Sequence, residues 1–272
     1  MNRLEKERVL PLLKKALEED VGSGDITTLA IVPEDLKVKG EFVVKEEGVL
    51  SGIEIPGWVF ELLDPGVEYR ILKKDGERIK KREIIAEVLG NARALLTGER
   101  VALNFLQRLS GIATLTRKFV DAVEGTGVKI LDTRKTTPLL RYLEKYAVRC
   151  GGGENHRFGL YDAVLIKDNH KRIAGGVKEA LSRIKGEIEV ENLEELKEAL
   201  DAGATWIMLD NFILEEIKKA VEIAKGKAKL EVSGGVNLES VKEIAKTGID
   251  YISVGKITHS APSLDISFEV RI

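Results

Sequence analysis

The segment EIEVENLEELKEALDAGATWIMLDN, residues 187–211, contains one complete strand–helix–strand unit. Its ends, EIEVE (187–191) and WIML (206–209), have the length and composition of short strands. The stretch between them is amphipathic, with Asn192 placed to cap the start of a helix and Gly203 just past its end. The pattern predicts a βα unit followed by the next strand of a parallel sheet.

The same rhythm continues on both sides of this segment. From residue 163 onward, short apolar runs recur about every 22 residues, the length of a compact βα unit. The four further runs are VKIL (128–131), AVLI (163–166), KLEV (229–232) and YISV (251–254). Six such strands predict a parallel α/β barrel, and both a complete and an incomplete barrel stay open because eight units are the full set. A doubly wound open sheet is the rival, and the absence of G-x-G-x-x-G after the first strand weighs against it.

A second amphipathic stretch in this repeat is NLESVKEIAKTG (237–248). Its Asn237 is suited to the N-cap and its Gly248 to the position just after the helix. We therefore expect a helix that begins directly after Asn237.

Residues 1–103 follow a different pattern, and we expect them to form a separate domain before a barrel domain at 104–262. Leu10, Leu13 and Leu17, with Val9 and Ala16, form an apolar stripe at helical spacing, whereas residues 38–44 alternate like a half-buried strand. This mixture predicts an α+β domain.

Further elements of the N-terminal domain can be placed from the same patterns. A helix is expected around 58–63, followed by strands at 67–72 and 79–88 that are separated by a turn at Asp75-Gly76. From residue 92 to about 123 the pattern is helical, in more than one piece because Gly98 and Gly111 interrupt it.

The bulk composition limits the classes of function. Hydrophobic residues make up 43% and charged residues 32% of 272, with a net charge of −2, so no general attraction to nucleic acid or membrane is expected. One cysteine excludes an internal disulfide framework and fits a reducing compartment. No apolar run reaches the roughly 20 residues of a membrane span, so the expected location is the cytoplasm. The abundance of Lys and Glu is typical of heat-adapted proteins.

Reactive residue types follow the predicted strands, where barrels carry their chemistry. A single polar residue at a strand end is usually explained by the exposure of the following loop to water. Here, however, six strand ends carry reactive residue types. The cationic residues among them would repel one another without a multiply anionic ligand; they are Arg134, Lys135 and Lys167, with His156 and Arg157 in the glycine-rich loop.

The other strand ends suggest a metal and a phosphate. Glu189 and Asp210 could hold a divalent metal through oxygen atoms. Ser233-Gly234-Gly235 and Gly255-Lys256 follow the last two strands, the usual place for a phosphate in barrels. The implied ligand is large, anionic, phosphorylated and metal-bound.

Several strings resemble those of the quinolinate phosphoribosyltransferases. They cover nearly the whole chain in the family's order, and TRKT followed by GGG-x-x-HR and K-D-N-H is highly specific. The strings are GSGDITT (22–28), ALLTGERVALNFLQRLSGIAT (94–114), TRKTTP (133–138), YAVRCGGGENHRFGL (146–160), DAVLIKDNH (162–170), EIEVENLEEL (187–196), IMLDN (207–211) and EVSGGV (231–236).

The resemblance implies an N-terminal α/β sandwich domain packed beside an incomplete, six- to seven-stranded parallel α/β barrel. The tail 263–272 is expected to rejoin the first domain. It also implies a homodimer whose active sites borrow residues from the partner subunit, with a hexamer of dimers left open.

The resemblance further assigns roles to individual residues, with phosphoribosyl pyrophosphate as co-substrate and Mg²⁺ as cofactor. The catalytic residues would be Lys135, Glu189 and Asp210. Quinolinate would be bound by Arg100 of the other subunit and by Arg134, His156, Arg157 and Lys167. Phosphoribosyl pyrophosphate would contact Lys135, Lys167, Glu189, Asp210, Ser233, Gly234 and Gly255, and Glu189 and Asp210 would hold Mg²⁺ directly or through water.

The implied activity is the transfer of phosphoribosyl to quinolinate with loss of CO₂, a step of de novo NAD synthesis. Three alternatives stay open at this point: a nicotinate phosphoribosyltransferase, a phosphate-binding barrel isomerase or lyase, and a non-catalytic relative. The excess of cations favours the diacid quinolinate over nicotinate, and a non-catalytic relative would be expected to lack part of the cationic set.

Overall fold

The computed structural model describes residues 3–271, and the chain divides into two compact units. Unit 1 contains the chain up to Leu115, the segment Tyr142–Gly152 and the residues from Ala261 onward. Unit 2 contains Thr116–Arg141 and Gly153–Ser260. The boundary expected between residues 103 and 104 falls inside one long helix, α4, because that helix continues from unit 1 into unit 2 without a break.

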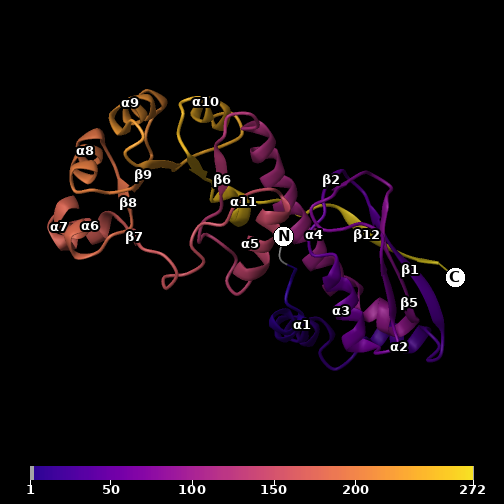
Figure 1. The fold of residues 1–272 in the computed structure, drawn as a ribbon. Helices are drawn as coiled ribbons and strands as arrows, with labels where there is room; N and C mark the ends of the chain where they lie inside the picture. The colour runs from indigo at the N-terminus through magenta and orange to yellow at the C-terminus, as the bar shows by residue number, and fades with distance from the viewer. Residues whose placement is uncertain (1–2, 272) are drawn as a thin grey trace. The chain divides into compact units, whose positions relative to one another are not determined.

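Unit 1 is built on an antiparallel sheet with the strand order β12-β1-β5-β3 (Figure 1). Its strands are β1 (Lys37–Val44), β3 (Glu68–Ile71), β5 (Ile84–Asn91) and β12 (Ile266–Arg271), with a small separate pair β2 (Gly48–Val49) and β4 (Arg78–Ile79). Its helices are α1 (Lys6–Val21), α2 (Ile26–Ile31), α3 (Glu54–Leu63), most of α4 (Ala92–Ala122) and most of α5 (Arg141–Cys150).

Aromatic side chains join the sheet of unit 1 to helix α3. Phe42 on β1 is fully buried, and its ring centroid lies 5.0 Å from that of Phe268 on β12 and 6.1 Å from that of Phe60 on α3. Phe42 and Phe268 are direct cross-strand partners. Such pairs stabilise beyond their buried area, so the tail is held by side chains as well as by the strand ladder.

The turn expected at Asp75-Gly76 is present, but the two strands next to it do not pair with each other. β3 pairs with β5, whereas β4, which follows the turn, pairs with β2. The stretch read as one strand at 79–88 is split by Arg82, whose φ of 71° is incompatible with a continuous strand.

Helix α4 is a single helix of 31 residues, contrary to the expected break at its glycines. Both glycines allow close packing. A Cβ at Gly98 would lie 2.9 Å from Leu63 Cδ1, and a Cβ at Gly111 would collide with the carbonyl oxygen of Pro262. Glycine therefore appears here because the helix is approached closely, at a cost in helix propensity.

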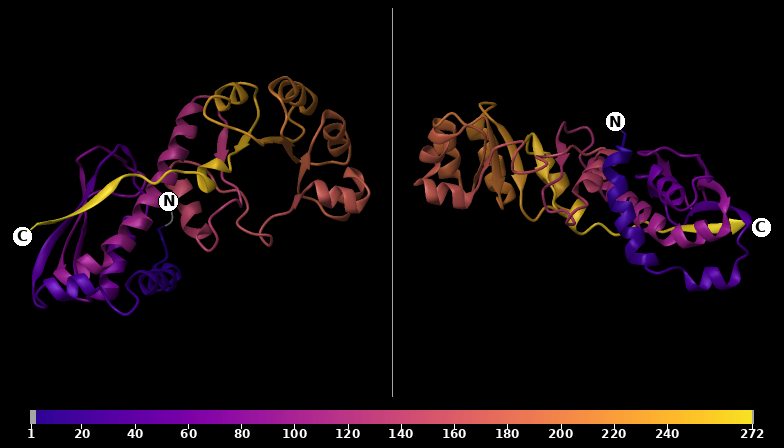
Figure 2. Two further views of the ribbon diagram at one scale, coloured as in Figure 1. Left: turned by 180° about the vertical axis from the view of Figure 1, so that it is seen from behind. Right: turned by 90° about the horizontal axis from the view of Figure 1, so that it is seen from below.

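Unit 2 is the incomplete parallel barrel that the sequence predicted, with the strand order β6-β11-β10-β9-β8-β7. Its strands are β6 (Lys129–Leu131), β7 (Leu165–Ile166), β8 (Glu187–Val190), β9 (Trp206–Asp210), β10 (Lys229–Ser233) and β11 (Tyr251–Ser253). The strands form a curved sheet with helices on its convex side, open between β6 and β7 (Figures 1 and 2). Its helices are α6 (Asp168–Ala174), α7 (Val177–Arg183), α8 (Leu193–Asp201), α9 (Leu214–Ala224), α10 (Val241–Ala245) and α11 (Lys256–His259).

One of the two predicted helix starts is confirmed and the other is displaced. Asn192 Oδ1 accepts a hydrogen bond from the Glu195 backbone N–H at 2.9 Å, and α8 begins directly after it. Asn237 instead accepts from the N–H groups of Glu239 and Ser240 in a turn, and α10 begins only at Val241. The Asn side chain stabilises a turn just as readily as a helix N-terminus.

Within residues 3–271, none of the helices is both long and apolar enough to cross a bilayer.

We predict that Gly111→Ala destabilises unit 1. The added methyl group meets backbone that cannot rotate away, which costs about 1–3 kcal/mol and exceeds the gain of about 1 kcal/mol in helix propensity. Urea denaturation should therefore give a lower free energy of unfolding than for wild type.

Gly98→Ala is the matched control in the same helix. Its new methyl group meets side-chain atoms of Leu63 and Phe60 at 2.9 and 3.1 Å rather than backbone, so its loss of stability should be smaller. A Gly111→Ala variant at least as stable as wild type would contradict the close approach of the tail.

Candidate active site

Unit 2 contains a cavity of 560 Å³ at the carboxyl ends of the barrel strands. Residues in or just after the strands β6 to β11 line it, together with His156 and Arg157, as expected for a parallel barrel. The lining side chains and glycines are Asp132, Thr133, Arg134, Lys135, His156, Arg157, Leu165, Lys167, Glu189, Met208, Asp210, Asn211, Ser233, Gly234, Gly235 and Ser253. The predicted site residues therefore lie together, with the exceptions of Arg100 and Gly255.

The two exceptions differ in kind. Arg100 belongs to α4 in unit 1, with its side chain 58% exposed and 3.9 Å from Glu99. Gly255 precedes α11 in unit 2, where a Cβ would lie 3.1 Å from Lys135 Cδ. Gly255 thus lies against a lining side chain without lining the cavity itself.

Cationic side chains crowd one part of the cavity. Arg157 has a lowered pKa because it is partly buried and because Arg134 lies close to it. The Nε of Arg134 is buried and has no hydrogen-bond partner among the described residues. A buried donor without a partner is costly, so this guanidinium is suited to an anionic ligand that supplies acceptors.

Two carboxylates face these cations. Lys167 Nζ lies 2.8 Å from Glu189 Oε2, and Glu189 is buried. The pKa of Asp210 is raised by its burial and by the negative charge of Glu189. A cation bound near both would relieve that repulsion, and their oxygen atoms suit a hard ion such as Mg²⁺.

A tight turn shapes the end of the cavity beyond β9 and β10. Asn211 has a φ of 57° and donates from Nδ2 to Asp210 Oδ2 at 2.8 Å. Gly234 has a φ of 94°, and a Cβ there would collide with the Asn211 side chain. Only glycine fits this position, which leaves the backbone accessible to a ligand.

The loop that carries His156 and Arg157 is anchored to the end of β6. Asp132 is fully buried and accepts from Asn155 Nδ2 at 2.5 Å and from the His156 backbone N–H at 2.9 Å. The Arg157 backbone N–H in turn donates to His156 Nδ1 at 2.8 Å.

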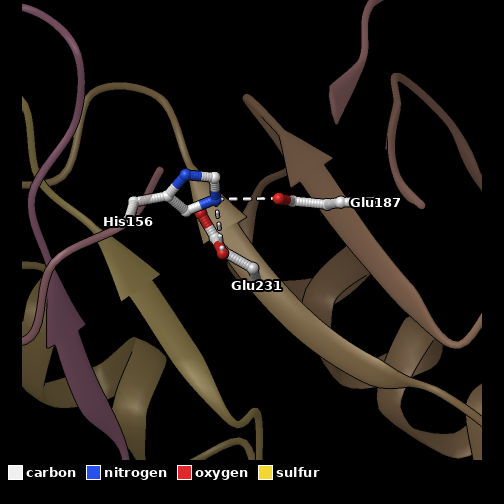
Figure 3. A group of neighbouring side chains, drawn as sticks. All are labelled: His156, Glu187 and Glu231. Carbon is white, nitrogen blue, oxygen red and sulfur yellow. Dashed lines mark hydrogen bonds and ion pairs between the residues drawn. The ribbon is translucent and has the colours of Figure 1, made fainter. Parts of the chain in front are cut away.

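The interior of the barrel contains a polar cluster of His156, Glu187 and Glu231 (Figure 3). His156 Nε2 lies 2.8 Å from Glu187 Oε2 and 3.6 Å from Glu231 Oε2. One ligand atom from each residue lies within 4.8 Å of the others, so the set could also hold a metal ion. Barrel interiors are usually filled by branched apolar residues, which makes this cluster unusual.

Sequence reasoning gave no role to Glu231 or Asn211. Glu231 stood inside the run KLEV, where a charged residue in an otherwise apolar strand was the available signal. Asn211 directly follows the predicted metal ligand Asp210, but no sequence pattern indicated its positive φ.

Comparisons with known proteins agree along the whole chain. The model of the quinolinate phosphoribosyl transferase N-terminal domain matches residues 25–110, and that of the C-terminal domain matches residues 112–269. A Bacillus subtilis (strain 168) protein named "probable nicotinate-nucleotide pyrophosphorylase (carboxylating)" is 46% identical and covers 100% of this chain and 96% of its own.

Two further relatives match this chain over nearly its whole length. A Methanocaldococcus jannaschii protein of the same name is 46% identical, covering 97% of this chain and 98% of its own. The structure of the nicotinate-nucleotide pyrophosphorylase from Francisella tularensis is 44% identical with a TM-score of 0.95, covering 99% of this chain and 98% of that one.

The cluster predicts a pH-dependent stability. Burial, and then the charge of Glu187, raise the pKa of Glu231 from 4.5 to about 7. Between these values the folded state binds more protons than the unfolded state, so this contribution to stability falls as pH rises.

Glu231→Gln removes this contribution. From pH 4.5 to 7 the unfolding free energy of wild type, minus that of Glu231→Gln, should fall by on the order of 2–3 kcal/mol. A difference that stays constant across this range would show that Glu231 is ionised throughout.

Proposed function

We propose that the 560 Å³ cavity of unit 2 is the active site of this chain, which belongs to the quinolinate phosphoribosyltransferase family. The enzyme transfers the phosphoribosyl group of phosphoribosyl pyrophosphate to quinolinate. CO₂ and pyrophosphate leave, and the product is nicotinate mononucleotide. The reaction supplies the pyridine nucleotide of de novo NAD synthesis.

One observation carries the assignment of the cavity. Arg134, Arg157 and Lys167 share it with two carboxylates, Glu189 and Asp210. Separate cationic and anionic groups are what the reaction needs, because quinolinate and pyrophosphate are anions whereas the sugar develops positive charge. We assign the cations to the quinolinate carboxylates, with Lys135 between the two substrates.

The carboxylates favour bond cleavage at the sugar. When the bond between ribose C1 and pyrophosphate breaks, positive oxocarbenium character develops, and Glu189 and Asp210 would stabilise it. The same two residues would hold Mg²⁺, directly or through water, and the bound ion would offset charge on the pyrophosphate. The pyridine nitrogen then attacks C1.

The phosphate end of the substrate is assigned to the glycine turn. Ser233 and Gly234 line the cavity, and Gly255 lies beside Lys135. Backbone N–H groups in such turns bind phosphate without a charged side chain.

Exposed apolar side chains support assembly into a homodimer. On α2 of unit 1, Ile26 is 81% and Ile31 is 74% exposed. In unit 2, Tyr161 and Ile173 line a second cavity of 630 Å³ and are also largely exposed. Apolar groups exposed in this way are typical of interaction surfaces. We also assign the protein to the cytoplasm, where its free Cys150 would stay reduced.

The first prediction concerns substrate choice. Nicotinate lacks one carboxylate and would leave cationic donors of the site unpaired. The enzyme should therefore prefer quinolinate by about 10²-fold or more in kcat/KM. Product formation from either acid with phosphoribosyl pyrophosphate measures this, and values within a factor of ten would contradict the assignment of the cationic cluster.

The second prediction is that Arg100 acts in the partner's active site. Arg100→Ala and Lys167→Ala should each be nearly inactive, but co-expression should restore about a quarter of wild-type sites, since half of the dimers are mixed and have one intact site. If Arg100 serves its own subunit, every site carries a lesion and activity stays at background. Mass spectrometry must confirm mixed dimers, and each single variant co-expressed with itself is the control.

A further inference from the structure

We propose that Glu187, backed by Glu231, makes His156 a positioning residue that fixes the backbone at Arg157. This inference rests on the proposed function and adds residues to its site. The ring of His156 would hold the loop and would not itself donate to quinolinate. The proposal depends on the tautomer of the ring, on the contacts that fix its plane and on the contacts that hold the loop.

The tautomer of His156 follows from its two neighbours. The backbone N–H of Arg157 is always a donor, so at 2.8 Å the Nδ1 atom must present its lone pair. A neutral imidazole then has its proton on Nε2, which lies 2.8 Å from Glu187 Oε2. The carboxylate accepts that proton's hydrogen bond and so selects the tautomer in which Nδ1 remains an acceptor.

Glu231 and its neighbours fix the plane of the ring. Glu231 is fully buried and accepts from Trp206 Nε1 at 3.2 Å, and its other oxygen contacts Ser253 Oγ. The Trp206 ring meets His156 edge-on at a centroid distance of 6.3 Å and stacks on Tyr251 at 4.7 Å. His156 therefore rests on a rigid surface inside the barrel.

The loop is held at successive residues. Asp132 binds the side chain of Asn155 and the backbone N–H of His156, and the His156 ring binds the next N–H, that of Arg157. The Arg157 side chain lines the substrate cavity. Asp162 holds the next two N–H groups, those of Phe158 and Gly159, so losing the Nδ1 contact would free the backbone N–H directly at Arg157.

The distances favour a hydrogen bond over a metal ion in this cluster. At 2.8 Å, Nε2 and Oε2 of Glu187 are at hydrogen-bond separation. Both Glu231 oxygens already have protein partners. A metal would also need the Nε2 lone pair, which the proton occupies in this tautomer.

The first test is spectroscopic and needs no turnover. In ¹⁵N-histidine-labelled wild type at pH 7, His156 should show a protonated Nε2 and an unprotonated Nδ1, assigned by the loss of its signals in His156→Gln. An imidazolium with both nitrogens protonated would overturn the proposal. Loss of the Nε2–H signal on adding Zn²⁺ would do the same, because the cluster would then be a metal site.

The second test separates the acceptor from the charge at Glu187. Glu187→Gln keeps an acceptor oxygen, so its quinolinate KM should stay within about threefold of wild type. Glu187→Leu removes the acceptor and should raise the quinolinate KM about tenfold or more, while the KM for phosphoribosyl pyrophosphate changes little. Equal losses in both variants, or a wild-type KM in Glu187→Leu, would overturn the proposal.

Folding and function can be told apart from this outcome. Glu187→Leu also removes Oε1, a buried oxygen without a hydrogen-bond partner among the described residues, so the variant is expected to fold. If it does not, the tautomer of wild type and the KM of Glu187→Gln still decide. If wild type fails to turn over quinolinate while the tautomer is as expected, the proposed function fails and the positioning contact stands.

Discussion

The parallel register of β8, β9 and β10 is the constraint on which the site depends. Ser233 lies opposite Asp210, and Glu189 lies opposite Met208, so alternate residues of three strands face the same cavity. A slip of one residue would turn Glu189 or Asp210 toward the helices and bury a charge among apolar side chains. The apolar residues between them, such as Ile188 and Leu209, are fully buried and hold the register. The chemistry of the cavity is therefore fixed by packing on the opposite face of the same strands.

The same barrel tolerates polar groups that a purely structural core would exclude. Buried charges rarely stabilise a fold relative to well-packed apolar residues. Here Arg134 Nε and Glu187 Oε1 are buried without a hydrogen-bond partner among residues 3–271. Arg134 faces the cavity, where an anionic substrate can supply the missing acceptor. Glu187 instead lies deeper and acts on His156. The two unpaired buried atoms therefore lower the folding stability, and in return the site is preformed.

Local patterns in the sequence predicted what local physics decides. The six strands, the cap at Asn192 and the strand-end residues that line the cavity follow from short-range spacing, and the family resemblance assigned the roles of those residues. The helix start expected at Asn237 was displaced by a local turn, whereas other wrong predictions involve distant partners. The glycine at position 111 of α4 is explained by the approach of Pro262, and β4 pairs with β2. The contact of His156 with Glu231 arises only when the barrel curves, and neither residue's neighbours in sequence signal it.

The interleaving of the two units affects how the protein is made. Residues 116–141 and 153–260 of unit 2 are synthesised before β12, which completes the sheet of unit 1. Until then one edge of β1, including the fully buried Phe42, lacks its partner strand. An open edge of this kind invites pairing with other chains. During translation unit 2 can fold on the ribosome, whereas unit 1 stays vulnerable to aggregation until β12 emerges, so chaperone dependence should concentrate in unit 1.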